Sequence, residues 1–286
     1  MRVTIPNTLN CGVIGVERLY NLIGAMPPAS HYVFDMNDVC FVEPCGAIAL
    51  LSAARHCTNV SGRRVILINI NQQVYLYLDR MNLFSIADHW LTPLKSVSGQ
   101  WSRSSFTANL LELTTVGGPN DVEEIIERAS RIFAPCLTED ELGSLLSVLS
   151  ELCSNIFEHS HDPCGCVLIQ KYHYEQRQQD CVCLSVGDMG RGVRTSLIEA
   201  HGVFGTSPLD YIQAAMNGRS SRKSGRGGLG LLNVRRILAA HGGYVCMRSE
   251  TAAVTDFDGK RAQGRSDLEH VAGTQVSVEM HSALVS

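Results

Sequence analysis

The sequence predicts an α/β protein built from two domains, on three observations. Apolar runs of strand length alternate with longer segments of helical character along the chain. The 286 residues suffice for two domains of ordinary size. Hydrophobic residues make up 45% and charged residues 18% of the chain, which provides material for packed cores. We therefore expect a smaller domain over residues 1–95, a polar linker over residues 96–118 and a larger domain over residues 119–286.

The smaller domain contains two predicted strands and two predicted helices. The strands cover residues 31–39 and 63–70, and the second has the continuous apolar character of a buried parallel strand. The helices cover residues 45–60 and 74–90, and Ser61-Gly62 ends the first of them. Strands that alternate with helices predict a small α/β domain with a parallel or mixed sheet.

Residues 33–57, VFDMNDVCFVEPCGAIALLSAARHC, resemble part of the STAS domain, the fold of the bacterial anti-anti-sigma factors. In phosphorylatable members of that family, the loop before the helix holds Asp-Ser-Ser-Gly, and the first Ser takes the phosphate. The aligned residues here are Glu43-Pro44-Cys45-Gly46. Proline has no hydroxyl group, so this regulation is not available at that position. The resemblance implies a docking or regulatory domain, and a plain α/β packing domain is the alternative.

Two helices are predicted at the start of the larger domain, over residues 120–134 and 138–159. The second begins with Thr138 followed by Glu141, which is the pattern of a capping box. Three polar residues follow on this helix at intervals of four, so we expect them on one face: Glu151, Asn155 and His159. An amide oxygen suits a hard cation such as Mg²⁺, and a carboxylate can deprotonate a water molecule. A solvated helix face would show the same spacing.

An apolar strand is predicted to end at Asp188, which is followed by Gly190 and Gly192. A carboxylate at a strand end can accept a hydrogen bond from the exocyclic amine of a flat heterocycle. The glycines would let the backbone approach such a ring closely. A surface turn is the alternative, because Asp and Gly are common in turns.

A second glycine-rich stretch leads into a helix predicted over residues 231–240. Gly228 and Gly230 stand at its start, where backbone N–H groups and the helix dipole attract phosphate. No Gly-Lys-Ser/Thr follows, so the stretch is not a Walker sequence, and it does not open the first crossover of a dinucleotide-binding sheet. Four nearby cations either reach phosphates or are solvated loop charges: Arg219, Arg222, Lys223 and Arg226.

Two Cys-x-Cys pairs raise the question of a zinc site: Cys164, Cys166, Cys181 and Cys183. They lie on two strands of a predicted hairpin that turns near residues 175–179, with the second pair opposite His173 and Lys171. The first pair then lies about 15 Å away, at a rise of about 3.3 Å per residue. Zinc ligands converge to about 2.3 Å from one ion. We therefore expect buried cysteines that pack as small hydrophobic side chains.

The order and spacing of these patterns resemble the GHKL superfamily, which unites histidine-kinase catalytic domains, type II topoisomerase and mismatch-repair ATPases, heat-shock chaperones and anti-sigma-factor kinases. The matching residues are Glu151, Asn155 and His159; Asp188, Gly190 and Gly192; Gly225, Gly228, Leu229, Gly230 and Leu231; and Gly273-Thr274. The resemblance covers residues 105–280 approximately. It implies a two-layer α/β sandwich with a Bergerat-type ATP site between a mixed sheet and helices, under a flexible lid over residues 205–227.

The resemblance also implies a role for each matching residue. Asn155 would hold the Mg²⁺ ion that bridges the phosphates, and Glu151 would be the general base. Asp188 would bind the adenine amine with support from Thr274. Other residues would complete the ATP site, by making room for the base or by holding the phosphates: His159, Gly190, Gly192, Arg226, Gly228, Leu229, Gly230 and Leu231.

These roles predict an Mg-ATP-binding signalling protein that hydrolyses ATP or transfers its γ-phosphate to a protein partner, nearest to the anti-sigma-factor serine/threonine kinases. The alternative is a non-catalytic ATP-dependent switch or dimerisation module. None of the ten histidines stands in a His-Glu/Asp-x-x-Pro context, so an autophosphorylating histidine kinase is disfavoured. We expect the partner to dock through the smaller domain, and the sequence leaves open whether the chain forms a homodimer.

Charge and hydropathy set further expectations. The net charge of −4 provides no basic surface for nucleic acid. The N-terminal residues lack a basic segment followed by an apolar one, so no signal peptide is predicted. Apolar runs such as CGAIALLSAA are far shorter than the roughly twenty residues of a membrane span. We therefore expect a cytoplasmic protein without a membrane anchor.

Overall fold

The computed structural model describes residues 1–10, 15–94, 109–174, 179–220, 230–259 and 261–281. The chain divides into two compact units. The N-terminal unit comprises Met1–Thr107 and Glu112–Thr114, and the C-terminal unit comprises Ala108–Leu111 and Thr115–Ser286. None of the helices in the described ranges is long and apolar enough to cross a membrane.

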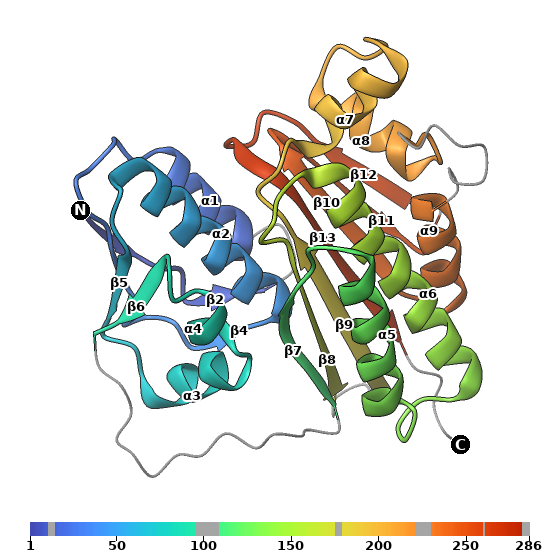
Figure 1. Cartoon of the computed structure of the whole chain (residues 1–286), viewed down its shortest axis with the longest axis horizontal. Coiled ribbons are helices and arrows are strands. Elements are labelled where there is room, and N and C mark those ends of the chain that lie inside the picture. Colours follow the sequence, from blue (N-terminus) through green and yellow to red (C-terminus); the bar gives the residue numbers. More distant parts are fainter. Residues whose placement is uncertain (11–14, 95–108, 175–178, 221–229, 260, 282–286) are drawn as a thin grey trace. The chain divides into compact units, whose positions relative to one another are not determined.

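The N-terminal unit is built on a parallel four-stranded sheet with the order β1-β3-β5-β6 (Figure 1). Its strands are β1 (Arg2–Thr4), β3 (Val33–Asp35), β5 (Val65–Ile68) and β6 (Leu91–Pro93), and β2 (Thr8–Leu9) pairs separately with β4 (Phe41–Val42). Its helices are α1 (Gly15–Gly24), α2 (Pro44–Ser61), α3 (Gln72–Arg80) and α4 (Leu83–Ile86). The prediction of a small α/β unit is confirmed, with the sheet entirely parallel among the pairings described.

Local sequence explains where the helices of this unit begin and end. Helix α2 begins at Pro44, where a missing N–H group costs nothing, and Gly62 ends it in the left-handed conformation with φ of 68°. The prediction of a single helix over residues 74–90 is wrong, because this stretch forms α3 and α4. Asn82 has a positive φ of 64°, which separates α3 from α4. The STAS resemblance of this unit stays a prediction.

The C-terminal unit is built on a seven-stranded sheet with the order β12-β11-β10-β13-β9-β8-β7. Its strands are β7 (Leu110–Thr115), β8 (Cys166–Tyr174), β9 (Gln179–Gly187), β10 (Tyr244–Glu250), β11 (Ala252–Phe257), β12 (Arg261–Arg265) and β13 (Val271–His281). Strand β7 lies within the predicted linker, and its residues Glu112–Thr114 are the segment that the division above groups with the N-terminal unit. The five pairings from β12 to β8 are all antiparallel, although the resemblance implied a mixed sheet.

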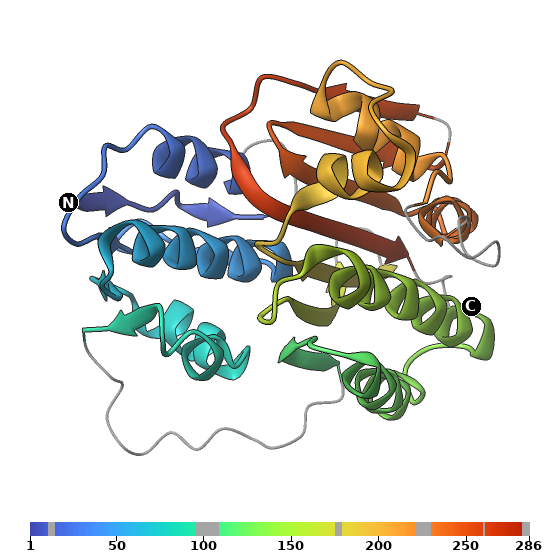
Figure 2. The same ribbon diagram turned by 45° about the horizontal axis from the view of Figure 1, so that its top comes forward.

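Helices α5, α6 and α9 lie over one face of this sheet and make the second layer of the sandwich (Figure 1). The helices of the unit are α5 (Pro119–Phe133), α6 (Glu139–Asn155), α7 (Gly192–His201), α8 (Pro208–Met216) and α9 (Gly230–Ala240), with a π-helical turn at Ile156–Ser160. Figure 2 shows the gold helix α7 beside the red strand β13, which it contacts, and α8 contacts β10, β11 and β12. A large sheet covered by helices fits the fold expected of a GHKL ATPase.

The core of the C-terminal unit follows from two periodicities. Alternate residues of β9 point to the helical layer, namely Val182, Leu184 and Val186, and all three are buried. They meet Leu145 and Leu149 from the apolar stripe of α6 in one cluster. This packing fixes which face of α6 remains available for ligands.

The hairpin between β8 and β9 differs from its predicted register by one residue. Tyr174 pairs with Gln179, so Cys181 lies opposite Tyr172 and Cys183 lies opposite Gln170, rather than opposite His173 and Lys171. The slip arises because four residues, 175–178, separate the paired ends, and loop length sets hairpin register. The separation of the two cysteine pairs is confirmed, because Cys166 pairs with Gly187, at the opposite end of β9 from Cys181.

Candidate functional site

Helix α6 carries the first group of predicted site residues. A capping box at Thr138 and Glu141 starts the helix, with the Glu141 carboxylate accepting the Thr138 N–H at 2.9 Å. Because Leu149 and Leu152 face the core, Glu151 and Asn155 lie on the side of the helix that remains partly exposed. Glu151 and Asn155 therefore both reach the second pocket described below.

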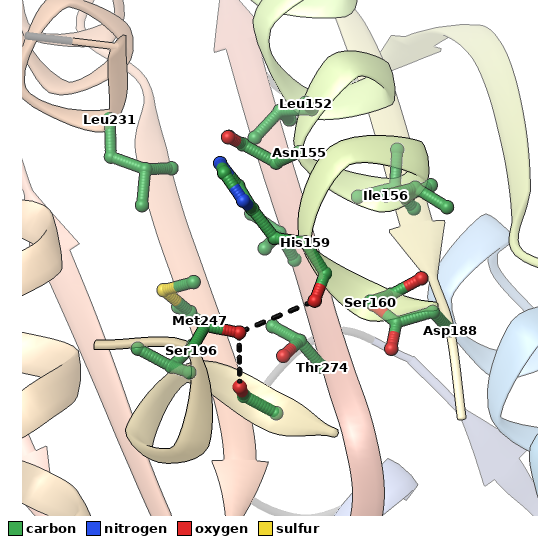
Figure 3. Close-up of a pocket in the computed structure, with 14 residues that line it drawn as sticks. Leu152, Asn155, Ile156, His159, Ser160, Asp188, Ser196, Leu231, Met247 and Thr274 are labelled. Carbon is green, nitrogen blue, oxygen red and sulfur yellow. Dashed lines mark hydrogen bonds between the residues drawn. The ribbon is translucent and has the colours of Figure 1, made fainter. Parts of the chain in front are cut away.

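The helix changes its winding directly after Asn155. Ile156–Ser160 form a π-helical turn, so His159 is not placed by the uniform α-helical spacing that the sequence predicted. Such turns often occur at functional sites. The His159 carbonyl accepts hydrogen bonds from Arg191 Nε at 2.7 Å and from Ser196 Oγ at 3.3 Å. These bonds tie the turn to the start of α7, and the His159 ring still lines the pocket described below (Figure 3).

Asp188 lies at the end of β9 and is 6% exposed. Its backbone N–H donates to the Thr274 carbonyl on β13 at 3.0 Å, and its Oδ1 accepts the Gly190 N–H at 2.8 Å. An Asp that caps its own turn in this way holds its carboxylate in a defined direction. The pairing of β13 with β9 therefore places Thr274 beside Asp188, although 86 residues of sequence separate them.

The glycine loop after Asp188 packs tightly against the π-helical turn. A Cβ atom on Gly190 would lie 1.9 Å from the Ser160 carbonyl oxygen, so only glycine fits there. The Ser160 carbonyl also accepts the Arg191 N–H at 3.0 Å. Gly190 thus serves the contact between two backbone segments, whereas Gly192 lines the pocket itself.

A first pocket of about 470 Å³, including its open mouth, lies between α6, α7 and the sheet. Its apolar walls are Leu152, Ile156, Val186, Val193, Leu231, Met247 and Val276. The polar side chains and the glycine that complete its lining are Asn155, His159, Ser160, Asp188, Gly192, Ser196 and Thr274. Figure 3 shows these groups around the cavity, with Ser196 hydrogen-bonded to the backbone of the π-helical turn. Apolar walls with a few polar groups suit a flat heterocycle.

A second pocket, also of about 470 Å³, opens next to the first. The two share Asn155, Val193, Ser196, Leu231 and Met247, so they form one continuous groove. The further residues of the second pocket are Glu151, Leu197, Ala215, Arg219, Ser220 and Gly230. The groove thus changes from an apolar end near Asp188 to a polar end that contains a carboxylate and a guanidinium group.

The polar end of the groove is organised by the start of α9. Gly230 is the first residue of this helix, where the positive end of the helix dipole favours anions. A Cβ atom on Gly230 would lie 1.7 Å from Glu151 Oε1, so the Glu151 carboxylate lies directly against this helix start. The Arg219 guanidinium lies 3.9 Å from the centre of the Phe204 ring, which holds it at the rim.

The predicted lid over residues 205–227 is only partly described. Its first part forms α8, in which Tyr211 and Ile212 are buried, so this part is an anchored helix. Arg226, Gly228 and Leu229 lie outside the described residues, together with Gly225, Arg222 and Lys223.

The structure adds site residues that the sequence patterns did not single out. Ser196 and Met247 line both pockets. Asp162 is buried, and its carboxylate accepts the Met189 N–H at 2.7 Å, which braces the loop after β9. Ser249 Oγ accepts the Val193 N–H at 3.2 Å and donates to the Gly273 carbonyl at 2.8 Å. Only the turn-forming Asp162 had a local signal, since it precedes a proline.

A groove that is apolar at one end and polar at the other, between a helical layer and a sheet, suits a nucleotide. Residues 141–282 match the family model of the histidine kinase-, DNA gyrase B- and HSP90-like ATPases. Residues 141–282 therefore form a GHKL-type ATPase domain, and a domain of this type implies ATP binding. A comparison with curated proteins found no match for the chain.

Proposed function

We propose that this protein is a signalling ATPase or protein kinase that uses Mg-ATP in the groove. The observation that supports the proposal is the second pocket, in which Glu151 and Asn155 share a cavity with the start of α9. A general base, an amide oxygen that can hold Mg²⁺ and a helix N-terminus are groups that promote cleavage or transfer of a γ-phosphate. The anti-sigma type of kinase remains the nearest family by resemblance.

ATP would lie along the groove with its base in the first pocket. The Asp188 carboxylate would accept a hydrogen bond from the adenine amine, and the apolar walls would cover the ring faces. The phosphates would lie at the polar end, against the N-terminus of α9 and within reach of Arg219. This orientation follows from the change in polarity along the groove.

The donor set at the polar end suits Mg²⁺, because Asn155 and Glu151 offer hard oxygen atoms. Asn155 would hold the ion, which when bound neutralises charge on the phosphates. The carboxylate of Glu151 would take a proton from the attacking water molecule or from the hydroxyl group of a protein substrate. Ser196 would keep the π-helical turn in place through its bond to the His159 carbonyl.

The fate of the γ-phosphate tests this proposal. Full-length protein would be incubated with γ-labelled Mg-ATP, with Asp188→Asn as the control. Asparagine keeps an oxygen for the Gly190 N–H but loses the charge that meets the adenine amine, so we expect the Kd for ATP to rise about tenfold to a hundredfold. Release of phosphate by the wild type, reduced in the control at limiting ATP, supports an ATPase.

A second variant separates binding from chemistry. Glu151→Gln should bind ATP as the wild type does, with turnover lower by about 10²–10⁴-fold. Unchanged turnover would remove Glu151 from the chemistry. Absence of ATP binding in the wild type would refute the proposal as a whole.

A non-catalytic switch is the second candidate function, and one contact favours it. Arg219 lines the second pocket and stacks on Phe204, whose neighbour Val203 is 76% exposed. Phosphates at the polar end could therefore alter an exposed loop without any chemistry. Intact nucleotide recovered after long incubation, with protease sensitivity near Val203 changed by ATP, would favour the switch.

A further inference from the structure

A second cluster of reactive side chains lies on the C-terminal unit, away from the groove. Cys181 on β9 and Glu279 and His281 on β13 place a sulfur, a carboxylate oxygen and a ring nitrogen within 4.8 Å of one another. His281 Nε2 is 2.7 Å from Glu279 Oε1, and Cys181 Sγ is 3.8 Å from Cys183 Sγ. The groove does not use any of these four side chains.

Strand pairing creates this cluster. Antiparallel pairing of β9 with β13 sets Cys181 opposite His281 and Cys183 opposite Glu279. Because side chains alternate along a strand, these four share one face of the sheet. Val182 and Met280 point to the other face, where the helices and the groove lie. The cluster is therefore on the side of the sheet that is remote from the nucleotide site.

The donor set matches the preferences of zinc. Thiolate, imidazole and carboxylate groups are its usual ligands, whereas Mg²⁺ and Ca²⁺ take oxygen ligands. Ligands at 2.0–2.3 Å in a tetrahedral site lie roughly 3.3–3.8 Å apart, so groups within 4.8 Å would need shifts of only about 1 Å. Cys183 Sγ lies 3.8 Å from Cys181 Sγ, which places a second sulfur beside these three donors.

We propose that Cys181, Glu279 and His281 form a binding site for a zinc-like divalent cation, with Cys183 as the neighbouring fourth donor. Cys181 is fully buried and Cys183 is 7% exposed, whereas the side chains of His281 and Glu279 are 19% and 15% exposed. An ion can therefore enter from the His281 side. The bound ion would join β9 to β13 and stabilise the sheet that carries Asp188 and Thr274.

Cobalt and zinc titrations of the full chain test the proposal. The protein would be purified under reducing conditions with a chelator and then freed of it. Co²⁺ should give the thiolate-to-cobalt charge-transfer absorption, and Zn²⁺ should displace it at one equivalent per chain. Competition with a chromogenic chelator would give the affinity for Zn²⁺ in each variant.

Two variants and a matched control assign the site. Cys181→Ser and His281→Gln should each weaken Zn²⁺ binding by at least about tenfold. Cys166→Ser removes another buried thiol from the same sheet, two strands from β13, and should leave the affinity unchanged. His281 lies partly exposed near the strand end, so His281→Gln tests the site even where Cys181→Ser does not fold.

Three results would overturn the proposal. They are the lack of a thiolate-to-cobalt band in the wild type, equal Zn²⁺ affinity in the wild type and in His281→Gln, and an equal loss of affinity in Cys166→Ser. ATP binding by Asp188→Asn and wild-type protein is measured separately, so the outcome here is independent of the proposed function.

Discussion

Substitution of Gly190 by alanine tests how the glycine loop is held against the π-helical turn. The new Cβ atom would lie 1.9, 2.5 and 2.8 Å from the oxygen, carbon and Cα atoms of Ser160. Side-chain carbons do not approach other atoms within 3.0 Å, so the backbone must separate by more than 1 Å. That movement breaks the 3.0 Å bond from the Arg191 N–H to the Ser160 carbonyl.

The expected cost adds two terms. Overpacking costs about 1–3 kcal/mol, and loss of one backbone hydrogen bond costs roughly 1 kcal/mol. We therefore expect the free energy of unfolding of the ATPase domain to fall by about 2–4 kcal/mol, a large share of the stability of a typical domain. The loop also carries Asp188, so ATP affinity should fall as well.

Urea titration with pulse proteolysis of the domain would measure the change, and Gly143→Ala is the matched control. Gly143 is exposed within α6, and a Cβ atom there meets no atom within 4 Å. Gly143→Ala should stabilise the domain by about 0.5–1 kcal/mol, because alanine has a higher helix propensity than glycine. Equal stability of Gly190→Ala and wild type would refute the reasoning about the Ser160 contact.

Three further predictions concern the groove, acid stability and thiol reactivity. Arg219→Ala should raise the Kd for ATP about fivefold, since an exposed cation contributes about 1 kcal/mol, and should leave the Kd for adenosine unchanged. Calorimetric titration measures both constants, and an equal loss of affinity for ATP and adenosine would contradict phosphate binding at Arg219. The Lys171 ammonium, 2.6 Å away, lowers the pKa of Asp180. That carboxylate therefore stabilises the fold above its unfolded pKa of about 4, and this contribution disappears as the pH falls through the lower folded pKa. In Asp180→Asn, the urea concentration at the midpoint of unfolding should consequently change less with pH in the acid range. Burial raises the pKa of Cys153 to about 12, so iodoacetamide at about pH 8 should leave this thiol unmodified. The exposed Cys40 should react under the same conditions, and peptide mass spectrometry would measure both outcomes.

Local sequence signals predicted most elements of the C-terminal unit. The capping box at Thr138 and the apolar stripe of α6 each depend on neighbours within one or two turns, and both are confirmed. The apolar strand before Asp188 is also confirmed, and it ends at Gly187. Such features are determined by short-range geometry, so they do not require knowledge of the fold.

Other features depend on contacts that no local pattern encodes. The π-helical turn after Asn155 is tied to Arg191 and Ser196, which belong to a later segment of the chain. The break between α3 and α4 depends on a left-handed Asn82. The hairpin register of β8 and β9 follows from loop length, and a one-residue error in that length moves every partner.

The sequence alone determined the class of the domain and some of the residues that line the groove, among them Asn155, Asp188 and Thr274. These residues belong to short motifs at the ends of strands and helices, whereas Ser196 and Met247 carried no such local signal. Tertiary structure alone decided which distant residues meet. The insertion of β13 between β10 and β9 brings Thr274 beside Asp188 and His281 beside Cys181. Strand order arises from packing of the whole sheet against its helices, and a single strand carries no record of its neighbours.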